Sequence, residues 1–521
     1  MTFTNSGVGR THGLWAKTRS PLRFLVLLAL LLVPGAPEIL AGQSGAGDTG
    51  SLNARIDAVL SRPPMDGVHW GVLLVDAERG EVLYGRNAHL RFVPASNMKL
   101  PVAATALDRL GPSWRYRTGF WVEPGALLEE GGRLAGDLTL VAHGDPSLGE
   151  PFHTSGEGAL GALADSLLAT GLREVDGDLV VDLAAWDSTT VPSGWLVGNL
   201  NARYAATGGA FSIENGELEL HLRGGTREGE PTRLAWSPVG TPDFVENRVT
   251  TGRVGSGAQV RTSYLPESRR WVVKGTIPPG GSERIVRAQR DPVRQAAHAL
   301  ARVLADEGLR INGELHLVWD RGEPLAGGCA AGSLPRCDAV RELAGMDSPP
   351  MTELVRAILE PSQNWMTEQL VRTLGAEVGE EGSWEEGFGV VADFLTGELE
   401  IDSLDVHFRD GSGLAGYNLI SPRALIRILD DARSRPWALA FHDAMAEPGK
   451  PRTTLSNRLT DLEGRVHAKT GTISHVNSLS GYLVSNDGRP LLFAVMSNAA
   501  NLPAGQIRRT IDDVVREMVR R

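Results

Sequence analysis

A serine and a lysine lie three residues apart in "PASNMKL", residues 94–100, as Ser96 and Lys99. If this segment begins a helix, the two side chains share one face and can meet. A serine hydroxyl is a poor nucleophile until a base removes its proton, and a desolvated lysine can be that base. The pair therefore predicts acyl transfer through Ser96. The alternative is a helix-capping serine followed by a surface lysine.

Lysine is scarce in this chain. There are five lysines among 52 basic residues, and arginine supplies every other basic side chain. Arginine is effectively never deprotonated, whereas a buried lysine can lose its proton, so a retained lysine is a candidate for base chemistry. Lys17 precedes the apolar run near the N-terminus, Lys274 in "VVKGTIPPG" is interpreted as structural and Lys450 in "EPGKPRTTL" as a loop charge. Lys99 and Lys469 are then the candidates.

A second motif, "EPSQNWMTEQL" at residues 360–370, places Ser362 and Asn364 at the entrance to a helix. Ser362 can relay a proton between the base and a leaving amine, and Asn364 can hydrogen-bond an amide of the substrate. Capping of the helix by turn residues is the alternative interpretation.

A third motif, "HAKTGTI" at residues 467–473, lies in a strand context. Lys469 adds positive potential, and Thr470 and Thr472 can hold a terminal carboxylate. Gly471 lets the strand backbone approach a substrate closely. The oxyanion of an acyl-transfer intermediate is expected between the backbone N–H groups of Ser96 and Thr472.

The three motifs in this order resemble the D-alanyl-D-alanine carboxypeptidase/endopeptidase family, the class C low-molecular-weight penicillin-binding proteins. The resemblance covers most of residues 50–521. "DGSGLAGYNLISP" (410–422) and "VAHGDPSLG" (141–149) are similar to further motifs of the family. A β-rich insertion of roughly 225 residues between the first and second motifs is also typical of it and is too large for a class A β-lactamase.

The resemblance implies a serine-type carboxypeptidase, and also an endopeptidase, that acts on the D-Ala-D-Ala end of peptidoglycan stem peptides through a Ser96 acyl-enzyme. β-Lactams are expected to acylate the same serine, and neither a cofactor nor a metal is expected. Two alternatives stay open. One is a β-lactamase or esterase on the same scaffold, and the other is a catalytically silent wall-binding module.

Three features depart from the family pattern. The second motif is Ser-Gln-Asn rather than Ser-Asp-Asn, and its middle residue is expected to point away from the substrate. Ala415 and Gly416 stand where many relatives have Ser-Arg, which puts the preference for a particular stem peptide in question. Pro101 lies five residues after Ser96, so either the helix kinks there or its first turn begins later.

The resemblance implies an α/β (α+β) fold with helices on an antiparallel sheet. Residues 1–41 are predicted to be a signal peptide, because basic residues precede the short apolar run "FLVLLALLLV" at 24–33. An uncleaved anchor is the alternative. A linker at 42–50 leads to a discontinuous catalytic domain, 51–114 and 341–521. Residues 115–340 form the β-rich insertion, with two subdomains expected.

Hydrophobic periodicity predicts the individual elements. A helix is expected around Leu52–Leu60, a pair of strands within 69–85, and a helix from Ser96 to about Leu110. Further helices are expected at 159–172, 292–309, 351–360, 364–379, 383–400 and 421–434, and strands at 464–473, 478–488 and 489–499. The last helix has an apolar stripe expected to face the core, and a membrane-lying helix is the alternative: Ile507, Ile511, Val514, Val515 and Met518.

The net charge of −11 argues against nucleic acid as a partner. The predicted signal peptide and the lack of a later apolar run of 18 residues favour an exported protein that contacts a membrane at most peripherally. In an oxidising compartment Cys329 and Cys337 could form a disulfide, although free thiols are the alternative. Asp145 and Asp410 are interpreted first as turn formers, with a substrate role as the alternative. His143, His467 and His475 lack the spacing of metal ligands.

Overall fold

The computed structural model describes residues 49–123, 126–241, 243–319 and 341–520. The predicted signal peptide, most of the linker, and Cys329 and Cys337 lie outside the described residues. Thr49 and Gly50, which were assigned to the linker, instead belong to helix α1 (Thr49–Leu60). Within the described residues, no helix is both long and apolar enough to cross a membrane.

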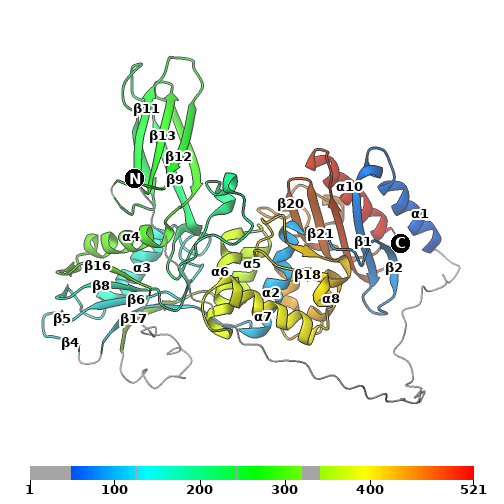
Figure 1. Ribbon diagram of the computed structural model, residues 1–521, viewed down its shortest axis with the longest axis horizontal. Coiled ribbons are helices and arrows are strands. Elements are labelled where there is room, and N and C mark those ends of the chain that lie inside the picture. The colour runs from blue at the N-terminus through cyan, green and yellow to red at the C-terminus, as the bar shows by residue number, and fades with distance from the viewer. Residues whose placement is uncertain (1–48, 124–125, 242, 320–340, 521) are drawn as a thin grey trace, which may run out of the picture. The chain divides into compact units, whose positions relative to one another are not determined.

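The third motif, at residues 467–473, lies on a strand of an antiparallel five-stranded sheet (Figure 1). Its strand order is β2-β1-β22-β21-β20. The pairing of β1 with β22 joins the beginning of the described chain to its end, and β20 lies at one edge. The strands are β1 (His69–Asp76), β2 (Val82–Arg86), β20 (Val466–Ile473), β21 (Val476–Val484) and β22 (Pro490–Asn498).

Both faces of this sheet are buried. Along β1, Val72 and Leu74 belong to one hydrophobic core, and Leu73 and Val75 belong to the other, as the two-residue period of a strand requires. Helices α1 and α10 (Ala504–Val519) fill the first core. The five apolar residues of the stripe on α10 are buried there, which confirms that this helix faces the core.

A layer of helices fills the second core and carries the first two motifs. Its members are α2 (Lys99–Arg109), α5 (Met351–Leu359), α6 (Asn364–Val378), α7 (Trp384–Asp393), α8 (Pro422–Ala432) and α9 (Ala438–Asp443). The periodicity predicted five of these helices but missed α9. The helix predicted at 383–400 covers both α7 and the π-helical turn Phe394–Glu398 that follows it.

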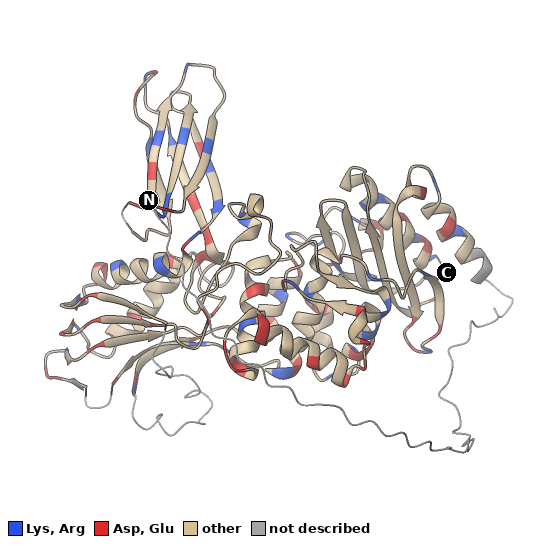
Figure 2. Ribbon diagram, in the orientation of Figure 1, with Lys and Arg blue, Asp and Glu red and all other residues tan. Residues whose placement is uncertain are grey.

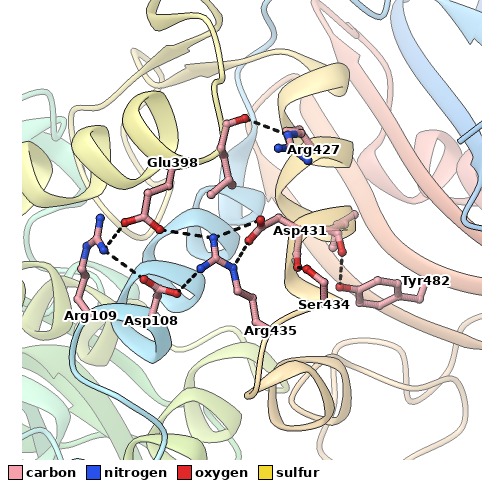
Figure 3. A network of polar contacts seen from close by, with 10 residues as sticks. Asp108, Arg109, Glu398, Arg427, Asp431, Ser434, Arg435 and Tyr482 are labelled. Carbon is pink, nitrogen blue, oxygen red and sulfur yellow. Dashed lines mark hydrogen bonds and ion pairs between the residues drawn. The ribbon is translucent and has the colours of Figure 1, made fainter.

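A network of ion pairs fastens the end of α2, the helix that begins with Lys99 (Figure 3). Arg435 donates to Asp108 at the end of α2 (3.0 Å) and to Asp431 on α8 (2.7 Å). Arg109 pairs with Glu398 of the π-helical turn. These side chains are partly buried, so the network is screened less than isolated surface pairs are.

The residues between the first and second motifs form further sheets. Strands β3 (Arg117–Val122), β6 (Leu138–Val141), β8 (Leu179–Asp182), β16 (Leu315–Val318) and β17 (Arg341–Asp347) make a mixed five-stranded sheet. Helices α3 (Gly156–Leu168) and α4 (Pro292–Asp306) share its hydrophobic core. The same stretch of the chain also forms a four-stranded sheet. Its strands are β4 (Leu127–Leu128), β5 (Arg133–Ala135), β7 (Glu174–Val175) and β15 (Arg310–Ile311).

Two three-stranded sheets, β10-β9-β14 and β11-β13-β12, share a separate apolar core. Residues of both charge signs are distributed along these strands, as Figure 2 shows. On β9, Leu218, Leu220 and Leu222 are buried and alternate with polar residues. The strands are β9 (Glu217–Arg223), β10 (Arg233–Ser237), β11 (Val245–Thr251), β12 (Gln259–Leu265), β13 (Arg270–Ile277) and β14 (Ser282–Ala288).

The first turn of the Ser96 segment differs from the expected α-helix. Residues Ala95–Met98 form a 3-10 turn, and α2 begins at Lys99. Pro101 is then the third residue of α2, where a backbone N–H has no intrahelical partner in any case. Of the two alternatives for Pro101, the later start of the helix is therefore correct.

Candidate active site

Ser96 lies on the 3-10 turn Ala95–Met98, which packs directly against strands β20 and β21. Asn97 Nδ2 donates to Ser478 Oγ, and Ser478 Oγ donates to the carbonyl of Pro94 at 2.6 Å. The turn is thereby tied to the sheet on both sides of Ser96. The Ser96 side chain does not cap α2, so the capping alternative is wrong for this residue.

Lys99 is fully buried, and its Nζ has three oxygen neighbours. The distances are 3.1 Å to Ser96 Oγ, 2.7 Å to Asn364 Oδ1 and 2.6 Å to the carbonyl oxygen of Ser412. Burial lowers the pKa of Lys99, while the Glu368 and Asp410 carboxylates oppose that shift. A surface position for Lys99 is therefore wrong.

The three neighbours determine where a neutral Lys99 amine would direct its lone pair. The oxygens of Asn364 and Ser412 can only accept hydrogen bonds, so they take the two N–H groups of the amine. The Ser96 hydroxyl is the one neighbour that can donate. The lone pair of the neutral amine is thus directed at the hydroxyl proton of Ser96, which is the arrangement a general base requires.

Asn364 has a role that the sequence did not indicate. Its Nδ2 donates to the carbonyl oxygen of Tyr204 at 2.8 Å. Because that carbonyl can only accept, the contact fixes the amide orientation and directs Oδ1 toward Lys99. Asn364 therefore holds the lysine, and its oxygen retains a second lone pair for a substrate N–H.

Ser362 and Lys469 form a second polar pair beside the first. Ser362 has a left-handed backbone with φ of 65°, a conformation that is uncommon for residues other than glycine and that clusters at functional sites. Lys469 Nζ lies 2.8 Å from Ser362 Oγ and also donates to the carbonyl of Thr470 at 2.8 Å. Burial, and then the charge of Lys99, lower the pKa of Lys469.

A cavity of about 300 Å³ opens onto these side chains. Its lining brings together residues from all three motifs with two arginines that the sequence analysis did not single out, Arg458 and Arg508. Arg458 is paired with Asp512 at 2.6 Å. The lining residues are Ser96, Ser362, Thr454, Arg458, Thr470, Gly471, Thr472 and Arg508.

Gly471 is required by the close approach of β20 to the Ser96 turn. A Cβ atom at this position would lie 2.7 Å from the carbonyl oxygen of Pro94 and 2.9 Å from the backbone nitrogen of Ser96. Both are backbone atoms and cannot swing aside. The glycine thus allows the turn and the strand to form one wall of the cavity.

A Gly471→Ala substitution should therefore displace Ser96 from β20. We expect the second-order rate constant for acylation by a β-lactam to fall at least about 100-fold, since a displacement near 1 Å can have this effect. Gly389→Ala is the matched control, because Gly389 lies on α7 with nothing within 4 Å of the added methyl group. An unchanged rate in Gly471→Ala would contradict the claim that the Ser96 turn must pack closely against β20 at this position.

Glu368 is a buried carboxylate that the sequence analysis missed. It accepts hydrogen bonds from the backbone N–H groups of Gly411 (3.0 Å) and Ser412 (2.8 Å) and from Trp384 Nε1 (2.9 Å). Burial raises the pKa of Glu368, and the nearby Asp410 carboxylate raises it further. Glu368 fixes the backbone at Gly411 and Ser412, and the carbonyl of Ser412 accepts from Lys99, so Glu368 positions the lysine indirectly.

Asp410 and Asp145 are turn formers, as the first interpretation proposed. Asp410 accepts from the backbone N–H groups of Gly413 (2.7 Å) and Ala415 (2.6 Å) and from Trp195 Nε1 (2.7 Å). Asp145 accepts from the N–H of Ser147 at 2.8 Å. Both carboxylates are almost fully buried, which argues against direct contact with a substrate.

The other basic and histidine candidates lie apart from this cavity. Lys450 forms an exposed ion pair with Glu360 at 3.0 Å, and Lys274 is exposed on β13. His475 contacts the carbonyl of Ala500 at 3.0 Å, and His143 faces Glu377.

The sequence model of the D-Ala-D-Ala carboxypeptidase 3 (S13) family matches residues 52–518. The chain belongs to this family. A D-alanyl-D-alanine carboxypeptidase from an Actinomadura species is 31% identical over 510 residues, which covers 95% of this chain and 89% of the relative. The carboxypeptidase DacB of Haemophilus influenzae is 23% identical over 455 residues, or 83% of this chain and 86% of the relative.

The fold of this D-Ala-D-Ala carboxypeptidase family member is also found among solved structures. Penicillin binding protein 4 of Haemophilus influenzae superposes with a TM-score of 0.75 at 21% identity, and the match covers 89% of this chain and 99% of that protein. The family resemblance and the α/β fold class, with helices on an antiparallel sheet, are therefore confirmed.

Proposed function

We propose that the chain is a serine-type D-Ala-D-Ala carboxypeptidase that works through a Ser96 acyl-enzyme. The observation that carries the proposal is the contact of the buried Lys99 amine with the Ser96 hydroxyl at 3.1 Å. Membership of the D-Ala-D-Ala carboxypeptidase 3 family supports the same activity.

In the proposed reaction, Ser96 Oγ attacks the carbonyl carbon of the penultimate D-alanine while Lys99 accepts the hydroxyl proton. The backbone N–H groups of Ser96 and Thr472 stabilise the oxyanion. The C–N bond then breaks, and a proton passes by way of Ser362 to the departing amine of the terminal D-alanine. Water hydrolyses the resulting ester and regenerates the serine.

The positive charges around the cavity favour a substrate with a free terminal carboxylate. Arg508 lines the cavity together with Thr470 and Thr472, which bring hydroxyl groups. Lys469 lies behind Ser362, with its Nζ 2.8 Å from Ser362 Oγ. Charge-assisted hydrogen bonds from such groups bind a carboxylate strongly. A peptide that lies along the edge strand β20 would place its C-terminal carboxylate among these groups.

The proposed substrates are peptidoglycan stem peptides outside the cytoplasm. The basic residues and apolar run near the N-terminus, the family membership and the carboxylate-binding groups support this proposal. An endopeptidase reaction follows the same chemistry when the leaving amine belongs to a neighbouring stem peptide. A β-lactam would acylate Ser96 and keep its amine tethered, which hinders hydrolysis.

The test is the release of D-alanine from a synthetic peptide that ends in D-Ala-D-Ala, compared with a matched peptide ending in L-Ala-L-Ala. We expect release from the first peptide alone. Equal cleavage of both peptides, or no release from the folded protein, would contradict the proposed specificity.

A further inference from the structure

A second cavity, of about 520 Å³, adjoins the sheet away from the Ser96 site. Its lining is mainly apolar, with Leu439, Tyr482, Leu483 and Leu491 among its members. Two histidines also line it, His442 of α9 and His467 of β20. Neither histidine has a part in the proposed acyl-transfer reaction.

His442, Asp443 and His467 form a cluster in this region. Their potential ligand atoms all lie within 4.8 Å of one another. His442 Nδ1 is 2.9 Å from Asp443 Oδ1, and the two imidazole rings have centroids 4.1 Å apart. Two imidazoles and one carboxylate are a ligand set that suits zinc and related divalent transition metals.

The backbone holds the three residues together. The N–H of Ala468 donates to the carbonyl of Ala446 at 2.9 Å, so the chain just after α9 is paired with β20 beside His467. His467 is itself in register with Tyr482 of the neighbouring strand β21. The cluster is therefore anchored to the sheet and does not depend on long, freely moving side chains.

One nitrogen of the cluster lacks a partner. Nδ1 of His467 is buried and has no hydrogen bond within the described part of the chain. The nearby Tyr482 hydroxyl donates to the carbonyl of Leu429 at 2.9 Å (Figure 3), so it is already engaged. An unsatisfied polar atom in a buried position is destabilising unless a ligand satisfies it.

Two arginines also line this cavity, Arg433 and Arg465, and each directs its guanidinium at a backbone carbonyl rather than at the cluster. The guanidinium of Arg465 donates to the carbonyl of Val484, and that of Arg433 donates to the carbonyl of Ala77. Burial, and then the charge of His442, lower the pKa of His467.

We propose that His442, Asp443 and His467 form a binding site for a divalent transition metal ion of the zinc type. Tetrahedral zinc with ligand bonds near 2.1 Å needs donor atoms about 3.4 Å apart. The side chains of His442 and Asp443 are 37% and 42% exposed and can turn by the small amount required. The fourth coordination position would be open to a water molecule or to a ligand in the cavity.

Bound metal would link α9 to β20 two residues before Lys469, on the same face of the strand. The proposed metal site and the Ser96 site thus share one strand but no residue. Failure of the metal proposal would leave the acyl-transfer proposal unaffected.

The test is titration of Zn²⁺ into the chelator-treated full chain, prepared without a polyhistidine tag, with binding followed by calorimetry. Visible absorption after Co²⁺ is added reports tetrahedral coordination independently. We expect one ion per chain, and His467→Ala should weaken binding at least about 100-fold. Asp443→Asn changes a more exposed ligand and should also weaken it, even if His467→Ala affects folding.

His316→Ala is the matched control, because His316 also lies beside a carboxylate, 3.2 Å from Asp178, in a different sheet. This variant should bind Zn²⁺ as the unmodified chain does. The proposal is overturned if the unmodified chain binds no Zn²⁺, or if the affinity of the His467 and Asp443 variants equals that of the His316 variant.

Discussion

Ser96→Ala is expected to lower the rate of D-alanine release at least about 10⁴-fold. Removal of the nucleophile leaves only the contributions of substrate binding and the oxyanion site, which are small beside covalent catalysis. Within the described residues, the side chain of Ser96 makes one hydrogen bond, with Lys99 at 3.1 Å, so the melting temperature should change little. Release of D-alanine and thermal unfolding are both measured on the same preparation.

Ser434→Ala is a suitable control for this substitution. Ser434 Oγ donates to the carbonyl of Asp431 at 2.8 Å, beside the ion-pair network (Figure 3). Ser434 does not line the cavity at Ser96. Its loss should leave the rate close to that of the unmodified chain. If Ser96→Ala retained more than a small fraction of the activity, a different nucleophile would have to be sought.

Lys99→Arg is expected to slow the acylation of Ser96 by about 10²–10⁴-fold, the usual contribution of a general base. Arginine keeps the positive charge but cannot release its proton near neutral pH. The bulkier guanidinium must also fit where the three oxygen neighbours of Lys99 now lie. Acylation by a fluorescent penicillin, followed over time, gives the rate constant.

The pH dependence of acylation provides a second measurement on Lys99. Burial lowers the pKa of Lys99, so the free amine forms as the pH rises through a value below the ordinary 10.4 or so. We therefore expect the acylation rate to increase with rising pH well below pH 10. This rising limb of the pH–rate profile should be absent in Lys99→Arg. Lys450→Arg, which changes a surface lysine paired with Glu360, should retain the limb. If the rise of the acylation rate with pH persisted in Lys99→Arg, Lys99 would not be the base.

Features determined by short stretches of sequence were predictable. The strand pair at 69–86, the helices at 351–359 and 422–432, and the core-facing stripe of α10 follow from local hydrophobic periodicity, and the structure confirms them. Ser96 and Lys99 were identified because they lie three positions apart and because lysine is rare in this chain.

Contacts between distant segments were not predictable from one sequence. Lys99 is separated by 265 residues from Asn364 and by 313 residues from Ser412, yet both accept its hydrogen bonds. Glu368 sits in an otherwise ordinary helical pattern, and only its burial beside Gly411 and Ser412 reveals its positioning role. The sequence offered one signal for the role of Glu368, which is a carboxylate on an otherwise apolar face of a predicted helix.

Backbone details of the first turn also escaped the sequence analysis. The segment from Ala95 to Met98 forms a 3-10 turn because its residues are tied to Ser478 and β20 rather than to one another alone. Helix propensity describes what the segment would do in isolation, whereas these tertiary contacts determine its geometry in the folded protein. The same limit applies to Asn364, whose partner Tyr204 lies 160 residues earlier in the chain.

The most direct test of the account is the position of the covalent adduct that a β-lactam leaves on the protein. Intact-mass measurement after incubation with penicillin, followed by peptide mapping, locates the modified residue. We predict one adduct per chain, on the peptide that contains Ser96, and none on Ser96→Ala. An adduct on another residue, or no adduct on folded protein, would contradict Ser96 as the nucleophile.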